Sequence, residues 1–283
     1  MDNRKEEFNS IMREATDKCF SDWWFIVEEE TLLYYYTDID ALLNGIIPNT
    51  PQENEEICLW ATRCTHLNDK NELKEGLEQL NKIVKPHVVE RLQEEVSVSH
   101  TISFSRKRDS LPMWSIYGKN GTGVMLSFDI HKLAYQYFHR LQPCIYCGSD
   151  YDKSVFENIT KRDWGDKFKS ANDKMKSDVS ICMALQYIML RKNMAFEYED
   201  ECRIVGIGLP HYAREKHRKV LYRNKNGVIV PYIEEYLPKE SLREVMIGPN
   251  IDPDLSKTTL EEFLNSRGFT DVKVNISKIP YRG

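Results

Sequence analysis

Short apolar segments of strand length recur along this chain, and segments with helical spacing separate them. The strand-like segments, rich in β-branched and aromatic residues, are 31–37, 57–64, 101–105, 124–129, 242–248 and 272–279. The helix-like segments, with apolar residues three or four positions apart, are 67–80, 86–96, 163–194 and 256–268. Strands and helices in this mixture predict an α+β (mixed α/β) fold around a central, mostly antiparallel sheet.

The first thirty residues differ from the rest of the chain. Residues 4–20 place apolar side chains at helical spacing, and no strand-like segment precedes residue 31. The chain contains no repeat and no linker rich in Ser, Gly or Pro. We therefore expect an N-terminal helical appendage at 1–30, followed by a single α+β domain at 31–283.

Charge and hydropathy limit the classes of partner. The net charge of -5 gives no general attraction to nucleic acid or to an anionic membrane, so we expect neither partner from bulk charge. No stretch approaches the roughly 18 apolar residues of a membrane-spanning helix, and the N-terminus lacks the apolar core of a secretory signal. The seven scattered cysteines do not form a disulfide framework, and together these features predict a cytoplasmic protein.

Acidic residues crowd the start of one apolar segment. Glu197, Glu199, Glu201 and Arg203 alternate along 197–209, and in an extended chain they would share one face. Carboxylates at such short spacing repel, and each raises the pKa of the other unless a cation or a ligand compensates their charge. One interpretation is a structural strand end in which Arg203 pairs with a carboxylate and keeps Glu201 ionised.

Two functional interpretations of the same carboxylates stay open. In one, Glu201 or Glu199 stabilises a cationic transition state. In the other, both glutamates join Asp69 and Glu72 around a divalent metal ion, which requires the fold to bring the four side chains together.

A strand with hydroxyl side chains and a basic loop follow each other at 101–108. Ser103 and Ser105 lie on one face of this strand, and in a cleft they would orient a carboxylate. The next residues include Arg106 and Arg108, which are either a solvated loop or an anion-binding group.

Five motifs occur in a characteristic order. They are Tyr34-Tyr35-Tyr36-Thr37, Leu67-Asn68-Asp69-x-x-Glu72, Ser103-Phe104-Ser105, Met113-Trp114-x-x-Tyr117 with Gly121-x-Gly123, and Glu199-x-Glu201-x-Arg203. Over about residues 31–250, this order resembles the bacterial family called domain of unknown function 2971. The chain has Tyr35 where members of that family usually have His.

The same order is more loosely similar to mono-ADP-ribosyltransferases, which place an Arg or His, a Ser-x-Ser strand and a Glu-x-Glu strand in succession. This resemblance implies NAD as a substrate that is cleaved at its nicotinamide–ribose bond, with no metal required. The implied catalytic residues are Glu201, Glu199, Ser103 and Ser105, and the implied NAD-binding residues are Tyr35, Thr37, Arg106, Trp114, Tyr117 and Arg203. Trp114 or Tyr117 would stack on nicotinamide, and Arg106 or Arg108 would hold the diphosphate.

The resemblance also implies a biological setting, a toxin or antiphage effector that modifies a protein or a nucleic acid. It does not identify the acceptor molecule. The alternatives are a catalytically inert binding or regulatory module on the same fold, which Tyr35 in place of His favours, and a metal-dependent nuclease or hydrolase.

Overall fold

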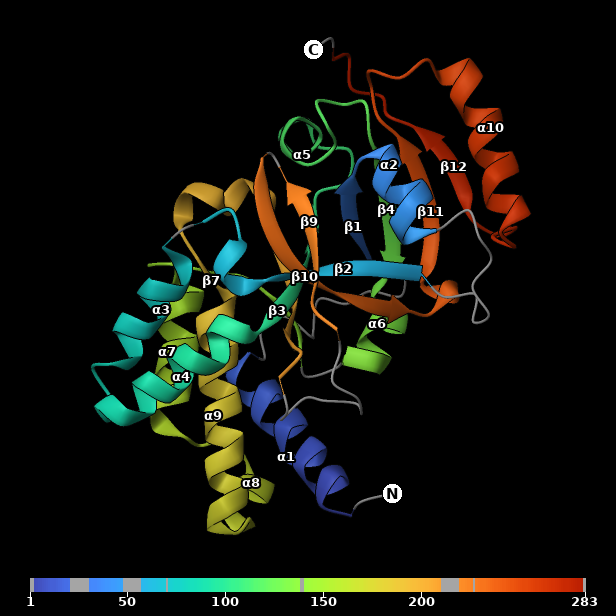
Figure 1. Cartoon of the computed structure of the whole chain (residues 1–283). Helices are drawn as coiled ribbons and strands as arrows, with labels where there is room; N and C mark the ends of the chain where they lie inside the picture. The colour runs from blue at the N-terminus through green and yellow to red at the C-terminus, as the bar shows by residue number, and fades with distance from the viewer. Residues whose placement is uncertain are drawn as a thin grey trace.

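A large sheet with mostly antiparallel pairing forms the centre of the computed structural model of this chain (Figure 1). The structure describes residues 3–20, 31–47, 57–69, 71–137, 140–209, 219–225 and 227–281. The fold is α+β, with a mostly antiparallel central sheet, as the alternation of segments predicted. The predicted domain boundary at residue 30 falls in 21–30, outside the described residues.

The sheet contains ten strands, eight of them in the order β12-β11-β4-β1-β3-β2-β10-β9, while β8 pairs with β3 and with β5. Their bounds are β1 Leu32–Thr37, β2 Ile57–Arg63, β3 His100–Ser105, β4 Val124–Asp129, β5 Leu141–Pro143, β8 Glu201–Ile207, β9 Leu221–Lys225, β10 Val228–Leu237, β11 Leu242–Ile247 and β12 Lys273–Ile276. Within this sheet the described pairs are antiparallel except β11 with β12. A separate parallel pair joins β6 (Ile145–Tyr146) to β7 (Arg191–Lys192).

One face of this sheet carries an apolar core. Leu33, Leu59, Phe104, Leu126 and Val245 come from five different strands and are buried in one cluster. The cluster takes every second residue of strands such as β2, where it includes Ile57, Leu59 and Ala61, as the two-residue period of a strand requires. Burial of this face therefore fixes the register of the pairing.

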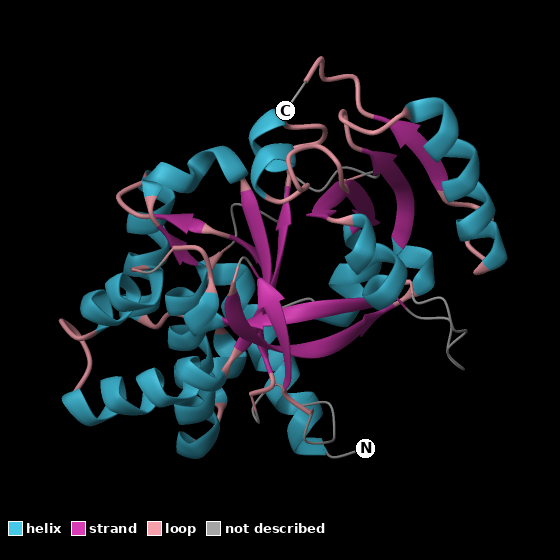
Figure 2. Cartoon of the chain, turned by 45° about the horizontal axis from the view of Figure 1, so that its top comes forward, coloured by secondary structure: helices cyan, strands magenta, loops and turns pink. Residues whose placement is uncertain are grey.

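Helices gather on one side of the sheet, at the lower left of Figure 1, and Figure 2 shows them from another direction. The helices of this layer are α1 Asn3–Cys19, α3 Glu72–Leu80, α4 Pro86–Val98, α7 Asp150–Lys161, α8 Asp166–Ser170 and α9 Asp173–Leu190. The other described helices lie elsewhere around the sheet, and they are α2 Ile39–Ala41, α5 Leu111–Ile116, α6 Ile130–Tyr137 and α10 Pro253–Ser266. The central helix of this layer is α9, which contacts α1, α3, α4 and β8. From Ile181 to Leu190 almost every side chain of α9 is buried, because neighbours surround that half of the helix.

The long helix expected over 163–194 is divided in the structure. Gly165, with φ of 106°, precedes α8, and Asn172 starts α9 by accepting a hydrogen bond from the Met175 backbone N–H at 3.0 Å. An Asn at this position satisfies one of the unpaired N–H groups at a helix start, so a new helix begins there. The helix ends at Leu190, and the next two residues form β7.

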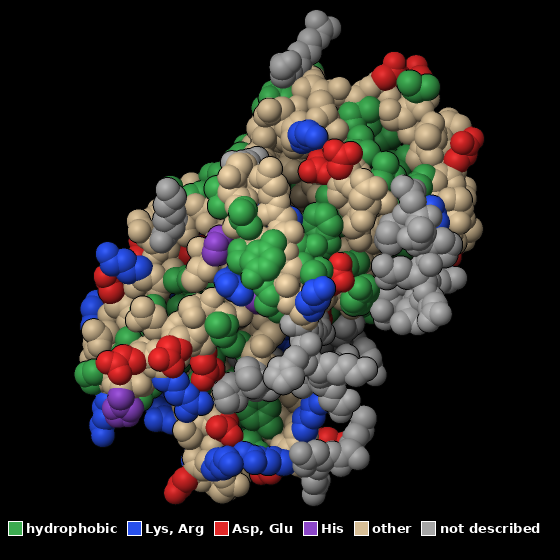
Figure 3. All heavy atoms as spheres, viewed as in Figure 1, with side chains coloured by type: hydrophobic (Ala, Val, Ile, Leu, Met, Phe, Trp, Pro, Cys, Tyr) green, Lys and Arg blue, Asp and Glu red, His purple; other side chains and the backbone are tan. Residues whose placement is uncertain are grey.

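Acidic and basic side chains are interspersed on the face shown in Figure 3, over both the helices and the sheet. Among the described helices, none has the length and apolar character needed to cross a membrane.

Candidate functional site

The sheet divides beside the middle of β3. One edge of β3 pairs with β2 at His100 and Thr101, and with β1 at Ser105. Between these two points lies Ser103, whose described partner is Arg203 of β8 on the opposite edge. The strands β1 and β2 therefore diverge from a common neighbour and leave an opening above Ser103.

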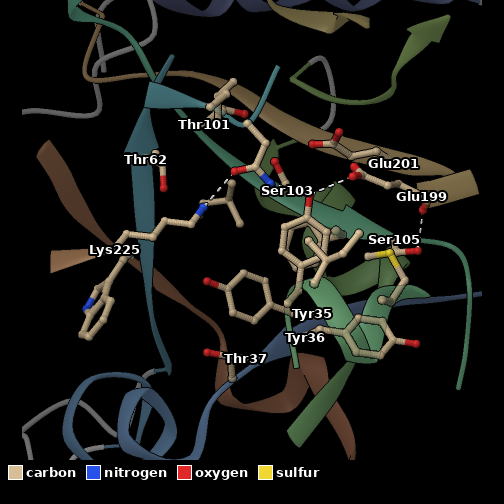
Figure 4. A pocket seen from close by; sticks show the side chains of 18 of the residues that line it. Tyr35, Tyr36, Thr37, Thr62, Thr101, Ser103, Ser105, Glu199, Glu201 and Lys225 are labelled. Atoms are coloured by element: carbon tan, nitrogen blue, oxygen red, sulfur yellow. Dashed lines mark hydrogen bonds between the residues drawn. The ribbon is translucent and has the colours of Figure 1, made fainter. Parts of the chain in front are cut away.

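A pocket of about 340 Å³ occupies this opening. Most of the residues expected at a site line it: Tyr35, Thr37, Ser103, Ser105, Tyr117, Glu199, Glu201 and Arg203. Their side chains come from four segments that lie far apart in the sequence, and Figure 4 shows the Tyr35 ring directed toward the side of the pocket where Lys225 lies. The order of motifs along the sequence thus corresponds to one place in the fold.

Two residues expected to bind the cofactor lie elsewhere. The side chain of Trp114 is fully buried against Tyr36, and its indole N–H donates to Asp109 at 2.9 Å, so the ring has no face in the pocket. Arg106 is likewise not part of the pocket lining, because its Nε donates to Asp200 at 2.8 Å.

Arg108, the other residue expected to hold a diphosphate, is also engaged outside the pocket. It donates to Glu244 at 2.8 Å. The basic loop is thus held by local ion pairs and does not contribute to the pocket.

The carboxylate segment is not extended throughout. Met194–Glu199 forms a 3₁₀ turn, Asp200 has a left-handed backbone with φ of 45°, and the strand begins only at Glu201. Ser105 holds this turn, since its hydroxyl donates to the Glu199 carbonyl at 2.6 Å. The alternation of charges along 197–203 therefore does not arise from a common strand face, although Glu199 and Glu201 still line the same pocket.

A buried lysine joins the two glutamates. The ammonium of Lys192, the second residue of β7, donates to Glu199 Oε2 and to Glu201 Oε2. All three side chains are at most 5% exposed. Each glutamate acts to raise the pKa of Lys192, against the opposing effect of burial, and the net result is a raised pKa. The lysine therefore stays charged and neutralises the repulsion between the carboxylates.

Arg203 extends this ion network into the protein. Its Nε lies 2.7 Å from Glu201 Oε1, and its Nη2 lies 3.0 Å from Glu72 Oε2. Burial by itself would raise the pKa of Glu201, but the adjacent Arg203 and Lys192 cations hold it well below its usual range. The expected pairing of Arg203, which keeps Glu201 ionised, is thus present in the structure.

A chain of hydrogen bonds crosses the pocket from Glu199. The Tyr117 hydroxyl donates to Glu199 Oε1 at 2.8 Å and accepts from Asn68 Nδ2 at 2.7 Å. Burial and the neighbouring Glu199 raise the pKa of Tyr117, so its hydroxyl keeps its proton. At the far end, Lys225 Nζ donates to Asn68 Oδ1 at 3.4 Å (Figure 4).

The pocket is also lined by three basic residues that were not predicted from the sequence, Lys192, Arg223 and Lys225. A signal for the last two exists in the segment 221–225, where Arg223 and Lys225 alternate with other residues at the spacing of one strand face. Lys192 has only a weak signal, because it is one of two basic residues, with Arg191, that follow a run of apolar residues.

The carboxylates proposed as metal ligands do approach one another, but their contacts are with cations and backbone groups. Glu72 and Glu201 meet Arg203, while Asp69 accepts from the backbone N–H groups of Asn71 and Asn193. Across the described parts of the chain, no cluster of three or more His, Cys, Asp or Glu side chains is arranged to hold a metal ion.

Comparison with known proteins gives one match. Residues 113–204 match the family described as Protein of unknown function (DUF2971), and this segment includes the Met-Trp and Glu-x-Glu-x-Arg motifs. The motifs of β1 and β3 lie before it, so the match supports the resemblance over a shorter range than residues 31–250. No curated protein and no solved structure matches the chain, and the likeness to ADP-ribosyltransferases stays a prediction.

Proposed function

We propose that the pocket binds NAD and cleaves its nicotinamide–ribose bond, as an ADP-ribosyltransferase-like enzyme would. The observation that carries this proposal is the convergence of Tyr35, Ser103, Glu199 and Glu201 on one pocket at the division of the sheet. A strand edge with a hydroxyl, an aromatic wall and two carboxylates is suited to a ribose whose anomeric carbon becomes cationic.

The reaction needs a negative group close to the ribose. As the bond between C1′ and the nicotinamide nitrogen breaks, its electron pair neutralises the pyridinium ring, and C1′ takes on oxocarbenium character. A carboxylate directed at this centre stabilises the developing charge. The acceptor then forms a bond to C1′ and releases a proton, which a carboxylate or water takes up.

Of the two carboxylates, Glu199 is the better placed for this role. Both oxygens of Glu201 contact cations, Oε1 meeting Arg203 and Oε2 meeting both Lys192 and Arg203. Glu199 contacts one cation, and its Oε1 accepts from the neutral Tyr117 hydroxyl. Glu199 therefore retains more negative charge for a ligand, and we assign Glu201 the task of positioning Lys192.

The other pocket residues would bind the substrate. The hydroxyl of Ser103 lies where β3 is open and suits a ribose hydroxyl, while the ring of Tyr117 offers a stacking surface for nicotinamide. The resemblance to toxin-like transferases favours a protein or nucleic acid as acceptor, in a cytoplasmic toxin or antiphage role.

Incubation of the purified chain with labelled NAD and a host lysate tests the proposal. We expect release of nicotinamide and transfer of label to a macromolecule. A chain that neither binds NAD, releases nicotinamide nor transfers label would overturn it.

A catalytically inert binding module is the second candidate, and two observations favour it. Tyr35 stands where the related family usually has His, and both oxygens of Glu201 are engaged by cations. Such a module would gain about 2.7 kcal/mol of stability from a ligand at 100 times its dissociation constant. A thermal shift with NAD, without nicotinamide release, identifies this alternative.

A further inference from the structure

The wall of the pocket opposite the glutamates carries two basic residues. Along β9, Arg223 and Lys225 are half-buried, while Tyr222 and Asn224 between them are exposed. Strand geometry therefore directs both basic side chains to the pocket side. Figure 4 shows Lys225 reaching into the pocket from the side opposite Glu199 and Glu201.

These two cations differ from the other cations that line the pocket. Lys192 and Arg203 contact buried carboxylates, and Lys119 lies 3.7 Å from Asp40. Within the described residues, neither Arg223 nor Lys225 has a carboxylate at ion-pair distance.

Neutral groups surround both cations of β9. Arg223 donates to the Thr62 hydroxyl at 2.9 Å and lies 5.1 Å from the ring centre of Trp60, and Lys225 meets the amide oxygen of Asn68. Two neighbouring positive charges in a half-buried wall are unfavourable unless an anion joins them. Burial and the charge of Arg223 lower the pKa of Lys225 by more than Glu199 and Glu201, across the pocket, raise it.

We propose that Arg223 and Lys225 form a subsite for a phosphate oxyanion, so that the pocket takes a phosphate-bearing nucleotide as its substrate class. A guanidinium presents paired N–H donors to phosphate oxygens, and the ammonium adds a point charge. This subsite replaces the anion-binding role expected of Arg106 and Arg108, which are held by Asp200 and Glu244.

The position of the subsite relative to Glu199 sets the orientation of the ligand. Only Asn68 and Tyr117 lie between Lys225 and Glu199 in the hydrogen-bond chain that crosses the pocket. One nucleotide can therefore place its phosphate at β9 and its ribose at Glu199. The orientation rests on the proposed function, whereas the anion subsite itself does not.

Calorimetric titration of the full chain with sodium pyrophosphate tests the subsite alone. We expect the wild type to bind, and Lys225→Glu and Arg223→Gln each to weaken binding by at least about tenfold, since each removes a charge-assisted contact. Lys273→Gln removes an exposed charge on β12 at the other end of the sheet and serves as the matched control.

Arg223 also packs on aromatic rings, so its replacement could disturb the fold. The milder variants Arg223→Lys and Lys225→Gln are therefore measured as well, and thermal melts confirm that each variant is folded. Titration with AMP and with single-stranded RNA separates a nucleotide ligand from a polymer. Binding of RNA in place of AMP would overturn the assigned substrate class.

Equal pyrophosphate affinity in wild type and folded Lys225→Glu would overturn the subsite, as would no binding to the wild type. Pyrophosphate binding that depends on Lys225 without any NAD cleavage would remove the proposed reaction and leave the subsite standing. NAD cleavage that is unchanged in Lys225→Glu would remove the subsite and leave the proposed reaction standing.

Discussion

The two ends of the pocket carry charge in different ways. At the end formed by β8, the carboxylates of Glu72, Glu199 and Glu201 are matched to two buried cations by short contacts. At the end formed by β9, Arg223 and Lys225 face neutral groups. The difference teaches that the fold fixes the charges of the first end, whereas the charges of the second are placed for a ligand.

Removal of Arg203 should cause the largest loss of stability. Arg203→Gln would leave Glu72 and Glu201 buried without their common cation, and breaking a buried pair in this way costs about 3–5 kcal/mol. Urea unfolding measures the free energy. Arg243→Gln, at an exposed ion pair with Asp129, is the control and should cost about 0–1 kcal/mol. Equal losses in the two variants would mean that the β8 end is not a fixed ion network.

The pH dependence of stability compares the fixed end with a buried histidine outside it. Arg203 and Lys192 hold the pKa of Glu201 low, so its charge persists in mild acid. His100 behaves differently, because burial and the nearby Arg63 lower its pKa to about 4. The unfolded chain then binds a proton near pH 6.5 that the folded chain binds only near pH 4, and stability is lost as the pH falls through this window.

For His100 the full loss amounts to about 3 kcal/mol, at 1.36 kcal/mol for each pKa unit, and about 2 kcal/mol of it falls between pH 7 and pH 4.5. Urea unfolding at pH 7 and at pH 4.5 measures it, with His100→Gln for comparison. The variant should lose less stability than the wild type between the two pH values. An identical loss would place the acid sensitivity on another group.

The hydroxyl of Tyr117 connects the two ends of the pocket, and its removal should lower the free energy of unfolding by less than the loss of Arg203 does. Tyr117→Phe deletes the hydroxyl that donates to Glu199 and accepts from Asn68, at a cost of about 1 kcal/mol in stability. Tyr222→Phe, on the exposed face of β9, should cost almost nothing. A fall in pyrophosphate affinity in Tyr117→Phe, beyond that in Tyr222→Phe, would show that the ends are coupled through this hydroxyl.

Local patterns in the sequence predicted most of the fold. Strand and helix periodicity arises from burial of one face, so segments such as 101–105 and 124–129 were identified correctly as β3 and β4. The helix expected over 163–194 was wrong in extent, because Gly165 and Asn172 interrupt a pattern that otherwise reads as continuous.

The residues of the site were harder to predict from the sequence than the fold was. The order of motifs brought Ser103, Glu199 and Glu201 to attention, and the structure places them in one pocket. Trp114 is buried, and Lys192 lies between the two glutamates, because segments distant in the sequence contact one another. No local sequence pattern encodes such contacts.

Nicotinamide release from NAD by the wild type and by Glu199→Gln tests the central claim most directly. Glutamine keeps the shape of the side chain and removes its charge, so the rate should fall by about 10²–10³-fold, the usual effect of losing one well-placed electrostatic contact. The melting temperature, recorded in parallel, shows whether each variant remains folded. Release by Glu199→Gln at the wild-type rate, or no release by the wild type in the presence of lysate, would contradict the account.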